Sequence, residues 1–364
     1  MTHSGRAIAS FRRRLCTWFA ARKRDLPWRG TRDPYAIWVS EAMLQQTRVE
    51  TVIPYYARFL ARYPDVAALA RAPEEDVLAL WSGLGYYRRA RSLRAAAREI
   101  VGEHAGRFPR EREALLDLPG FGPYTAGAVL SIAFDLPEPL VDGNVARVLA
   151  RHFAIEEPID SKVARERSWE LARELVPPTP SRTGSPVSPR NFNQGLMELG
   201  ALVCTPRAPL CGECPLRSSC AARAAGRQEE LPRRARGRPQ LDVRLEVLIV
   251  RRRGRVLVVR RPARGRMERM WELPTRELPD GRGRVRGLWP AEHAVPLRAG
   301  EELGSLRHSI THHRISAAIR AGRLSNQVPA DSDRLRWVQA GEFEGLAVTG
   351  LTRKLLAKDR SNGG

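Results

Sequence analysis

Residues 115–134 of the 364-residue chain read LLDLPGFGPYTAGAVLSIAF, and this stretch decides which fold is expected. The segment L-P-G-F-G separates two helical patterns, and Gly120 and Gly122 permit a tight turn between them. The helix after the turn begins with backbone N–H groups that lack partners inside the helix, and such an end binds a phosphate group. Taken alone, the stretch also fits an ordinary helix–helix connection, so the rest of the chain must decide.

Four of the five cysteines lie close together, in CTPRAPLCGECPLRSSC at positions 204–220. Their spacing is C-x6-C-x2-C-x5-C, through Cys204, Cys211, Cys214 and Cys220. In a reducing compartment, clustered cysteines hold metal more often than they form disulfides. One C-x2-C knuckle is present where a structural zinc site usually has two. The spacing therefore favours a [4Fe-4S] cluster, with zinc as the alternative. The fifth cysteine, Cys16, is interpreted as a small buried hydrophobe.

The formal charge of +22 comes almost entirely from arginine, because the chain has four lysines among its 62 basic residues. Such a charge indicates an anionic partner, either nucleic acid or an acidic membrane surface. A GC-rich genome is an alternative source of the arginines. No apolar run is long enough for a signal peptide or a membrane span. We therefore expect a cytoplasmic protein that does not insert into membranes.

The pattern of apolar residues changes along the chain. Residues 6–225 show three- and four-residue apolar spacing, which predicts successive amphipathic helices. The segment LPRRARGRPQ at 231–240 lacks periodicity and is predicted to be a linker. Residues 241–261 alternate and then turn at Gly254, which predicts a hairpin that opens an α/β domain. The expected domains are therefore 1–230 and 241–364.

Three motifs in this order, LPGFGPYTAGA, VDGNVARVLAR and the cysteine spacing, resemble the endonuclease III superfamily of DNA repair glycosylases. LPWRGTRDPYAIWVSEAMLQQTRVETVIPYY and WSGLGYYRRARSL closely resemble its MutY-type adenine DNA glycosylases. The resemblance covers roughly residues 24–220. It implies a mostly α helix-hairpin-helix fold, in which a six-helix barrel joins a [4Fe-4S] cluster domain. It also implies base excision repair, with removal of adenine mispaired with 8-oxoguanine or guanine in double-stranded DNA.

Hydrolysis of a purine N-glycosidic bond needs an acid for the leaving base and a carboxylate for the developing sugar cation. The resemblance assigns the acid that protonates adenine N7 to Glu41 and the carboxylate to Asp142, with Tyr124 and Asn144 orienting them. The alternatives are a solvated first-turn acid for Glu41 and an ordinary N-cap for Asp142. We expect burial or the charge of Asp142 to raise the pKa of Glu41, and hydrogen bonds to keep Asp142 ionised.

Lyase members of the superfamily carry a lysine two residues beyond the hairpin glycine, where it attacks the sugar. This chain has Tyr124 at that place. The lysines of the first domain, Lys23 and Lys162, lie in no matching motif. The sequence therefore predicts a monofunctional glycosylase.

The target adenine must leave the base stack, which costs a few kcal/mol, and the protein must fill the gap. The resemblance implies that Gln45, Gln46 and Tyr86 occupy the gap and stack beside 8-oxoguanine, with Leu44 as an apolar wedge. The alternatives are a polar helix face for the glutamines and a helix-capping turn for GLGYY, and Tyr87 is interpreted as a core residue. Phosphate contacts are predicted for Arg88, Arg89 and Arg91, although a solvated arginine face is the default for such a run.

The C-terminal segments LDVRLEVLIVRRRGRVLVVRRP and MWELPTRE resemble the Nudix-like domain of the same family. The acidic box of a working Nudix hydrolase, G-x5-E-x7-R-E-x2-E-E-x-G, is missing, so pyrophosphate hydrolysis is not expected. LRHSITHHRI at 306–315 takes the place of the family's F-S-H loop for 8-oxoguanine, with Ile310 and Thr311 replacing phenylalanine and serine. Thr311 and His312 are the predicted lesion contacts. An exposed strand with incidental histidines is the alternative.

The competing functions are a thymine glycosylase for G:T mismatches, a lesion-binding protein without catalysis, and a nucleotide pyrophosphatase. Glu41 argues for adenine because protonation at N7 requires a purine. Asp142 and Glu41 in undisturbed motifs argue against a non-catalytic protein. We expect a monomer that works on nucleoid DNA.

Overall fold

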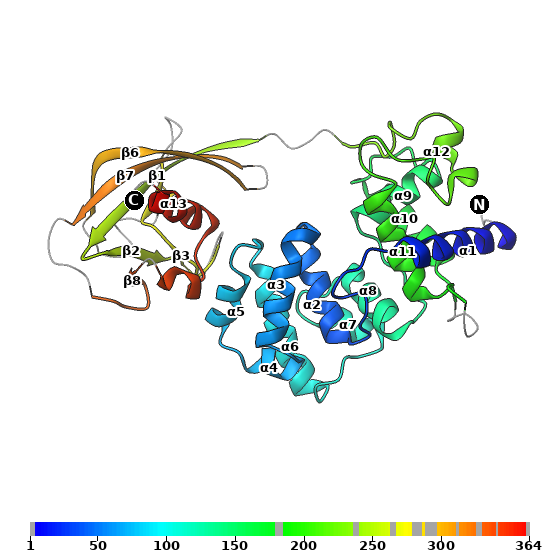
Figure 1. Cartoon of the computed structure of the whole chain (residues 1–364), viewed down its shortest axis with the longest axis horizontal. Coiled ribbons are helices and arrows are strands. Elements are labelled where there is room, and N and C mark those ends of the chain that lie inside the picture. Colours follow the sequence, from blue (N-terminus) through cyan, green and yellow to red (C-terminus); the bar gives the residue numbers. More distant parts are fainter. Residues whose placement is uncertain are drawn as a thin grey trace. The chain divides into compact units, whose positions relative to one another are not determined.

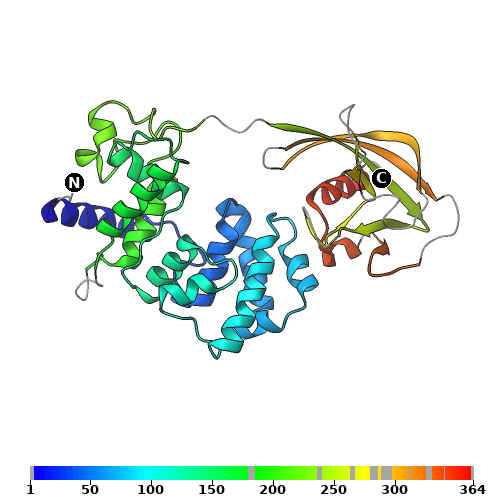
Figure 2. The same cartoon turned by 180° about the vertical axis from the view of Figure 1, so that it is seen from behind.

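The computed structural model describes residues 4–178, 185–235, 240–262, 267–278, 286–287, 297–310, 313–324, 330–339 and 341–361. The chain divides into two compact units (Figures 1 and 2). The first unit comprises Met1–Arg71 and Ser92–Gly237, and the second comprises Ala72–Arg91 and Arg238–Gly364. Within the described ranges, no helix is both long and apolar enough to cross a membrane.

The elements of the first unit are helical. They are α1 (Gly5–Arg22), α2 (Pro34–Leu44), α3 (Val49–Arg62), α4 (Val66–Arg71), most of α6 (Arg88–Glu103), α7 (Arg112–Asp117), α8 (Pro123–Phe134), α9 (Gly143–His152), α10 (Lys162–Leu175), α11 (Pro189–Leu202), η1 (Arg217–Ser219) and α12 (Ala221–Ala224). Six of these helices begin at a side chain that accepts a backbone N–H hydrogen bond, which satisfies donors that the first turn leaves free. The capping residues are Ser4, Asp33, Asp65, Asp142, Ser161 and Ser188.

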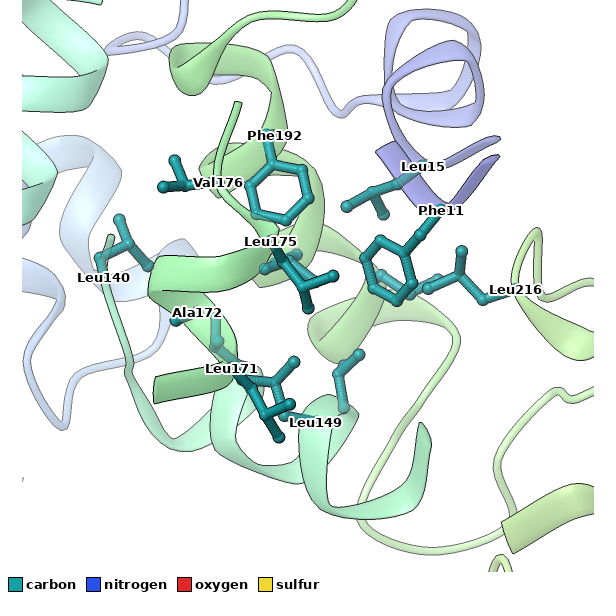
Figure 3. Close-up of a cluster of buried hydrophobic side chains, with 14 of the residues drawn as sticks. Phe11, Leu15, Leu140, Leu149, Leu171, Ala172, Leu175, Val176, Phe192 and Leu216 are labelled. Carbon is teal, nitrogen blue, oxygen red and sulfur yellow. The ribbon is translucent and has the colours of Figure 1, made fainter. Parts of the chain in front are cut away.

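A hydrophobic core joins α1, α9, α10 and α11 (Figure 3). Phe11 and Leu15 of α1 lie in this cluster with Phe192 of α11 and Leu175 of α10. Burial of one such side chain stabilises the fold by about 1.5–3 kcal/mol. Cys16 is fully buried in the same cluster, which confirms its interpretation as a hydrophobe.

The stretch at 115–134 forms the predicted hairpin between α7 and α8. Gly120 has φ +80°, and a Cβ atom at this position would lie 2.4 Å from the Cβ of Ser92. Both the backbone conformation and the close approach therefore require glycine. Gly122 precedes α8 without a side-chain cap, so it leaves the first backbone donors of the helix available. Gly127 packs α8 against the carbonyl of Pro139, where a Cβ atom would lie at 2.0 Å.

The second unit combines a mixed sheet with helices. Its elements are α5 (Glu74–Trp81), β1 (Leu241–Arg252), β2 (Arg255–Arg260), β3 (Trp271–Glu272), β4 (Thr275–Leu278), β5 (Arg286–Gly287), β6 (Leu297–Ile310), β7 (His313–Leu324), β8 (Leu335–Val338), η2 (Glu342–Gly345) and α13 (Gly350–Ser361). Strand β1 pairs antiparallel with β2 and β4 and parallel with β7. The pairs Val247↔Thr275 and Val247↔Ile319 fix its register.

The predicted hairpin at Gly254 is confirmed. Arg253 and Gly254 both have positive φ, as a tight two-residue β-turn requires, and Arg252 pairs with Arg255 across it. Strands β6 and β7 form a second hairpin, in which Ile310 pairs with His313. Thr311 and His312, the predicted lesion contacts, lie outside the described residues.

The predicted linker starts with residues that are bonded to the first unit. The carbonyl of Leu231 accepts a hydrogen bond from Arg151 Nε at 2.7 Å, and the carbonyl of Arg233 accepts one from Ile159 N at 2.9 Å. Positions 236–239 of the linker lie outside the described residues. The predicted domain boundaries stay a prediction.

Candidate active site and iron-sulfur site

A cleft of about 790 Å³ lies in the first unit, at the ends of α2, α8 and α9. Its volume is in the range of sites that bind small ligands, and so it has room for a nucleobase. The structure brings nine of the residues that the sequence singled out into the wall of this one cleft. They are Glu41, Leu44, Gln45, Gln46, Gly120, Gly122, Tyr124, Asp142 and Asn144.

Glu41 projects from α2 and is 5% exposed. The Tyr124 hydroxyl donates a short hydrogen bond to Glu41 Oε2. Burial raises the pKa of Glu41 to about 7, and the charge of Asp142 adds to this, whereas the Tyr124 hydrogen bond and the charge of Arg29 oppose it. A carboxyl with this pKa carries its proton at neutral pH about half of the time. The predicted direction of the shift is confirmed, and a solvated position for Glu41 is wrong.

Asp142 is both an N-cap and a cleft residue. Its Oδ1 accepts a hydrogen bond from Val145 N at 2.7 Å, and its Oδ2 accepts one from Asn144 Nδ2 at 3.0 Å. Burial raises the pKa of Asp142, while these hydrogen bonds and the charge of Arg147 lower it. The expected hydrogen bonds are therefore present, but they do not fully offset the burial. Its capping role fixes the carboxylate at the edge of the cleft.

Tyr124 lies in the first turn of α8, directly after the hairpin. Burial is the main reason that its pKa is raised well above the ordinary range, and the charges of Glu41 and Asp142 add to this. The phenol is therefore a hydrogen-bond donor at neutral pH. Its hydroxyl also lies 3.5 Å from the sulfur of Met197, a cleft residue that the sequence did not single out.

A second buried glutamate lies in the same cleft and was missed by the sequence argument. Glu198 of α11 is 1% exposed and accepts hydrogen bonds from Arg24 Nη2 at 2.9 Å and Arg29 Nη2 at 2.7 Å. Burial alone would raise the pKa of Glu198, but the Arg24 hydrogen bonds and the Arg29 charge lower it overall. The backbone carbonyl of Arg29 is in turn held by Arg190 Nη2 at 3.0 Å. The paired arginines of RDLPWR were the available sequence signal.

The four clustered cysteines line one largely apolar pocket in the first unit. Four thiols and an apolar lining, which includes Leu199, Val203 and Leu216, are the donor set and surroundings that a [4Fe-4S] cluster requires. The pocket therefore brings all four predicted ligands to one site.

Helix α9 connects this pocket with the cleft. Arg151 Nη1 lies 3.3 Å from Cys204 Sγ, and Arg147 Nε donates to the Cys204 carbonyl at 2.7 Å. Arg147 Nη2 also donates to Asn144 Oδ1 at 2.8 Å, and Asn144 bonds Asp142. The two arginines are four residues apart, so they lie on the same face of the helix. The spacing R-x3-R was the sequence signal for this pair.

The remaining predicted DNA contacts belong to the second unit. Tyr86 is 44% exposed and has φ +48°, and Arg88 is exposed at the start of α6. Two neighbouring arginines are bonded within the protein, and their phosphate contacts stay a prediction. Arg89 Nη2 donates to the Leu84 and Gly85 carbonyls, and Arg91 pairs with Glu74 and the Glu268 carbonyl.

Comparisons with known proteins identify the family. Adenine DNA glycosylase of Rattus norvegicus is 37% identical over 96% of this chain and 77% of its own length. Adenine DNA glycosylase of Homo sapiens is 35% identical over 96% of this chain and 73% of its own length. The chain belongs to the adenine DNA glycosylases. It is therefore a DNA N-glycosylase of base excision repair that acts on adenine.

Family models divide this adenine DNA glycosylase in the same way as its motifs. The HhH-GPD superfamily base excision DNA repair protein model matches residues 39–174, and the NUDIX domain model matches residues 246–358. The iron-sulfur binding domain of endonuclease III matches residues 204–220. Cys204, Cys211, Cys214 and Cys220 are thus the ligands of a [4Fe-4S] cluster, and the zinc alternative is set aside.

Two solved structures share the helical fold. A thermostable thymine-DNA glycosylase has a TM-score of 0.53 and 33% identity, and covers 60% of this chain and 98% of its own. A non-covalent endonuclease III–DNA complex has a TM-score of 0.50 and 21% identity, and covers 62% of this chain and 99% of its own. The rat and human adenine DNA glycosylases, unlike these two, match 96% of this chain.

Proposed function

We propose that this adenine DNA glycosylase removes adenine mispaired with 8-oxoguanine or guanine from double-stranded DNA. It acts as a monomer on nucleoid DNA in the cytoplasm. The observation that carries the proposal is the buried Glu41, whose pKa is about 7, in the same cleft as Asp142. One carboxyl that holds a proton and one that is supported as an anion are what purine excision requires.

In the proposed mechanism, the adenine enters the cleft and the protonated Glu41 carboxyl gives its proton to N7. The protonated base is a better leaving group, so the bond from N9 to the sugar breaks and positive charge develops on the sugar. The Asp142 carboxylate stabilises this charge, either by its field or through a transient adduct. Tyr124 holds Glu41 in place through its hydrogen bond, and Asn144 holds Asp142.

The oxygen of a water molecule then bonds to the sugar carbon that adenine has left, and the Glu41 carboxylate takes up the proton that the water loses. The described wall of the cleft contains no lysine, and Tyr124 stands where the lyase members carry one. No amine is therefore present at this position to form a Schiff base with the sugar. The enzyme is proposed to be monofunctional.

Binding of the DNA is proposed to use both units. Leu44, Gln45 and Gln46 fill the gap that the adenine leaves, and the N-terminus of α8, with Gly120 and Gly122, binds a phosphate. Tyr86 stacks beside 8-oxoguanine, and Arg88 meets the backbone. Thr311 and His312 contact the 8-oxoguanine edge.

When bound, the [4Fe-4S] cluster cross-links Cys204, Cys211, Cys214 and Cys220 and so fixes the loop that carries Arg207. The same loop receives Arg147 and Arg151 from α9. The cluster pocket thereby supports the helix whose N-cap is Asp142.

The decisive experiment is single-turnover release of adenine from a duplex that carries adenine opposite 8-oxoguanine. We expect rapid release by the wild type and loss of about 10²–10⁴-fold in Glu41→Gln and Asp142→Asn, the range for a general acid or base. Glu113→Gln and Asp117→Asn, both exposed on α7, are matched controls that keep full activity. Unchanged release in Glu41→Gln would contradict the mechanism.

A further inference from the structure

The turn that carries Tyr86 belongs to the second unit rather than to the catalytic unit. This turn connects α5 with α6, and Tyr86 occupies the left-handed region with φ +48°. A non-glycine residue in this region costs about 1–3 kcal/mol, so the surrounding structure must hold it there. Hydrogen bonds to Val348 and Arg353 hold the turn in place.

Tyr87, the neighbour of Tyr86, anchors the turn to the C-terminal sheet. It is 5% exposed, and its hydroxyl donates to the Val348 carbonyl at 3.3 Å. The same hydroxyl accepts from Gly83 N at 3.3 Å and lies 3.3 Å from Ser82 Oγ. Val348 forms a β-bridge with Trp271 of β3, so the anchor leads directly into the sheet.

A second anchor comes from α13. Arg353 Nη2 donates a short hydrogen bond to Ser82 Oγ. Ser82 Oγ also lies 3.5 Å from the Val348 carbonyl. Ser82 at the start of the turn and Tyr87 at its end thus both bond the Val348 carbonyl.

Arg89, at the start of α6, bonds back to the turn. Its Nη2 donates to the Leu84 carbonyl at 3.2 Å and the Gly85 carbonyl at 3.0 Å. Its guanidinium also lies 5.6 Å from the centre of the Tyr86 ring, within the distance of a cation–π contact. The carbonyls before Tyr86 and the ring itself therefore share one partner.

We propose that the C-terminal α/β fold positions Tyr86 for stacking on 8-oxoguanine, and that Tyr87 is the positioning residue that transmits this. The inference rests on the proposed function, because it takes 8-oxoguanine as the base that Tyr86 meets. It adds that the second unit, and not the catalytic unit, holds Tyr86 in place. The C-terminal fold then contributes to the discrimination of 8-oxoguanine from guanine through the position of the Tyr86 ring.

The test is a double-mutant cycle of Tyr87→Phe with Tyr86→Ala in the full-length holoenzyme. The readout is the ratio of affinities for duplexes carrying 8-oxoguanine or guanine opposite 2′-fluoro-2′-deoxyadenosine, an adenosine analogue that resists excision. In the wild-type background, we expect Tyr87→Phe to lower this ratio about 5- to 10-fold, as for the loss of one hydrogen bond. In the Tyr86→Ala background it should lower the ratio no further, because both residues act through one contact.

The matched control is Tyr35→Phe, which removes another buried phenol hydroxyl that donates to a backbone carbonyl, that of Tyr63 at 2.8 Å. Its ratio should stay at the wild-type value. Ser82→Ala, the second test variant, should lower the ratio in the same direction as Tyr87→Phe. An equal fall of the affinity ratio in both backgrounds would overturn the inference alone. The same holds if neither Tyr87→Phe nor Ser82→Ala lowers the ratio. A wild-type enzyme without preference for 8-oxoguanine would overturn both the inference and the proposed substrate.

Discussion

Two buried glutamates lie in the same cleft, and their surroundings move their pKa values in opposite directions. Glu41 has one hydrogen-bond donor, the neutral Tyr124, and burial raises its pKa to about 7. Glu198 has two arginines, and its pKa is lowered although it is even less exposed. Burial alone therefore does not set the protonation state, because charged hydrogen-bond partners can outweigh it.

The difference also gives the two glutamates opposite effects on stability as the pH changes. The Glu198 contribution is present above the unfolded pKa and is lost as the pH falls through the lowered folded pKa. The ionisation of Glu41 costs stability as the pH rises from its unfolded pKa of 4.5 to about 7. A cleft can thus hold one structural carboxylate and one acid at the same pH.

The largest expected effect comes from breaking the Glu198 side of the comparison. Glu198→Ala should lower the free energy of unfolding by about 3–5 kcal/mol, because Arg29 then keeps a buried charge without its partner. Guanidinium unfolding at pH 7 measures this change. Glu113→Ala, at an exposed position, is the control with little effect. A loss below about 1 kcal/mol would show that the pair is not needed.

Removing the charge at Glu41 should change the free energy of unfolding in the opposite direction. At pH 8, Glu41→Gln should raise the free energy of unfolding by about 3 kcal/mol, because a shift from 4.5 to about 7 corresponds to that energy. At pH 4 the variant and the wild type should differ little, since Glu41 is then protonated in both the folded and the unfolded state. Unfolding curves at the two pH values test this. A pH-independent difference would rule out ionisation as its cause.

Tyr124→Phe sharpens the comparison because it removes the hydrogen bond that lowers the pKa of Glu41. The alkaline limb of the single-turnover rate should move to higher pH by about one to two units, as expected for a hydrogen bond to a charged group of about 1.5–3 kcal/mol. Profiles from pH 5 to 10 measure the midpoint. A shift to lower pH would mean that Tyr124 stabilises the protonated form instead.

Arg24→Ala should have the smallest effect. The Arg24 side chain is about one third exposed, and Arg29 remains to pair with Glu198. We expect a loss of about 1 kcal/mol in the free energy of unfolding and no movement of the alkaline limb. Thermal melting and the pH–rate profile check the two parts separately. A shifted limb would show that Arg24 also acts on Glu41.

Features with local causes were predictable from the sequence. The hairpin at Gly120 and the β-turn at Gly254 follow from backbone conformations that glycine adopts, and the cysteine spacing indicated the cluster. The cleft residues Glu41 and Asp142 were found because their motifs resemble those of a known family. Each of these signals lies within a short segment.

Features that join distant segments were not predictable. Glu198 lies 174 residues from Arg24, so no local pattern linked them. The run at 88–91 looked like one solvent-facing arginine face, but Arg89 turns back onto the preceding loop. The grouping of residues 72–91 with the C-terminal unit likewise joins distant positions, such as Tyr87 and Val348, which are hydrogen-bonded although 261 residues apart.

Two of the side chains predicted to contact DNA, Gln46 and Tyr86, share an unfavourable backbone conformation, with φ +58° and +48°. Glycine at either position would relieve that strain and would leave the DNA-free protein at least as well folded. Selection for stability alone would therefore favour glycine at both sites. Keeping a long side chain there sacrifices part of the folding energy in the resting enzyme for a shape that is useful when damaged DNA arrives.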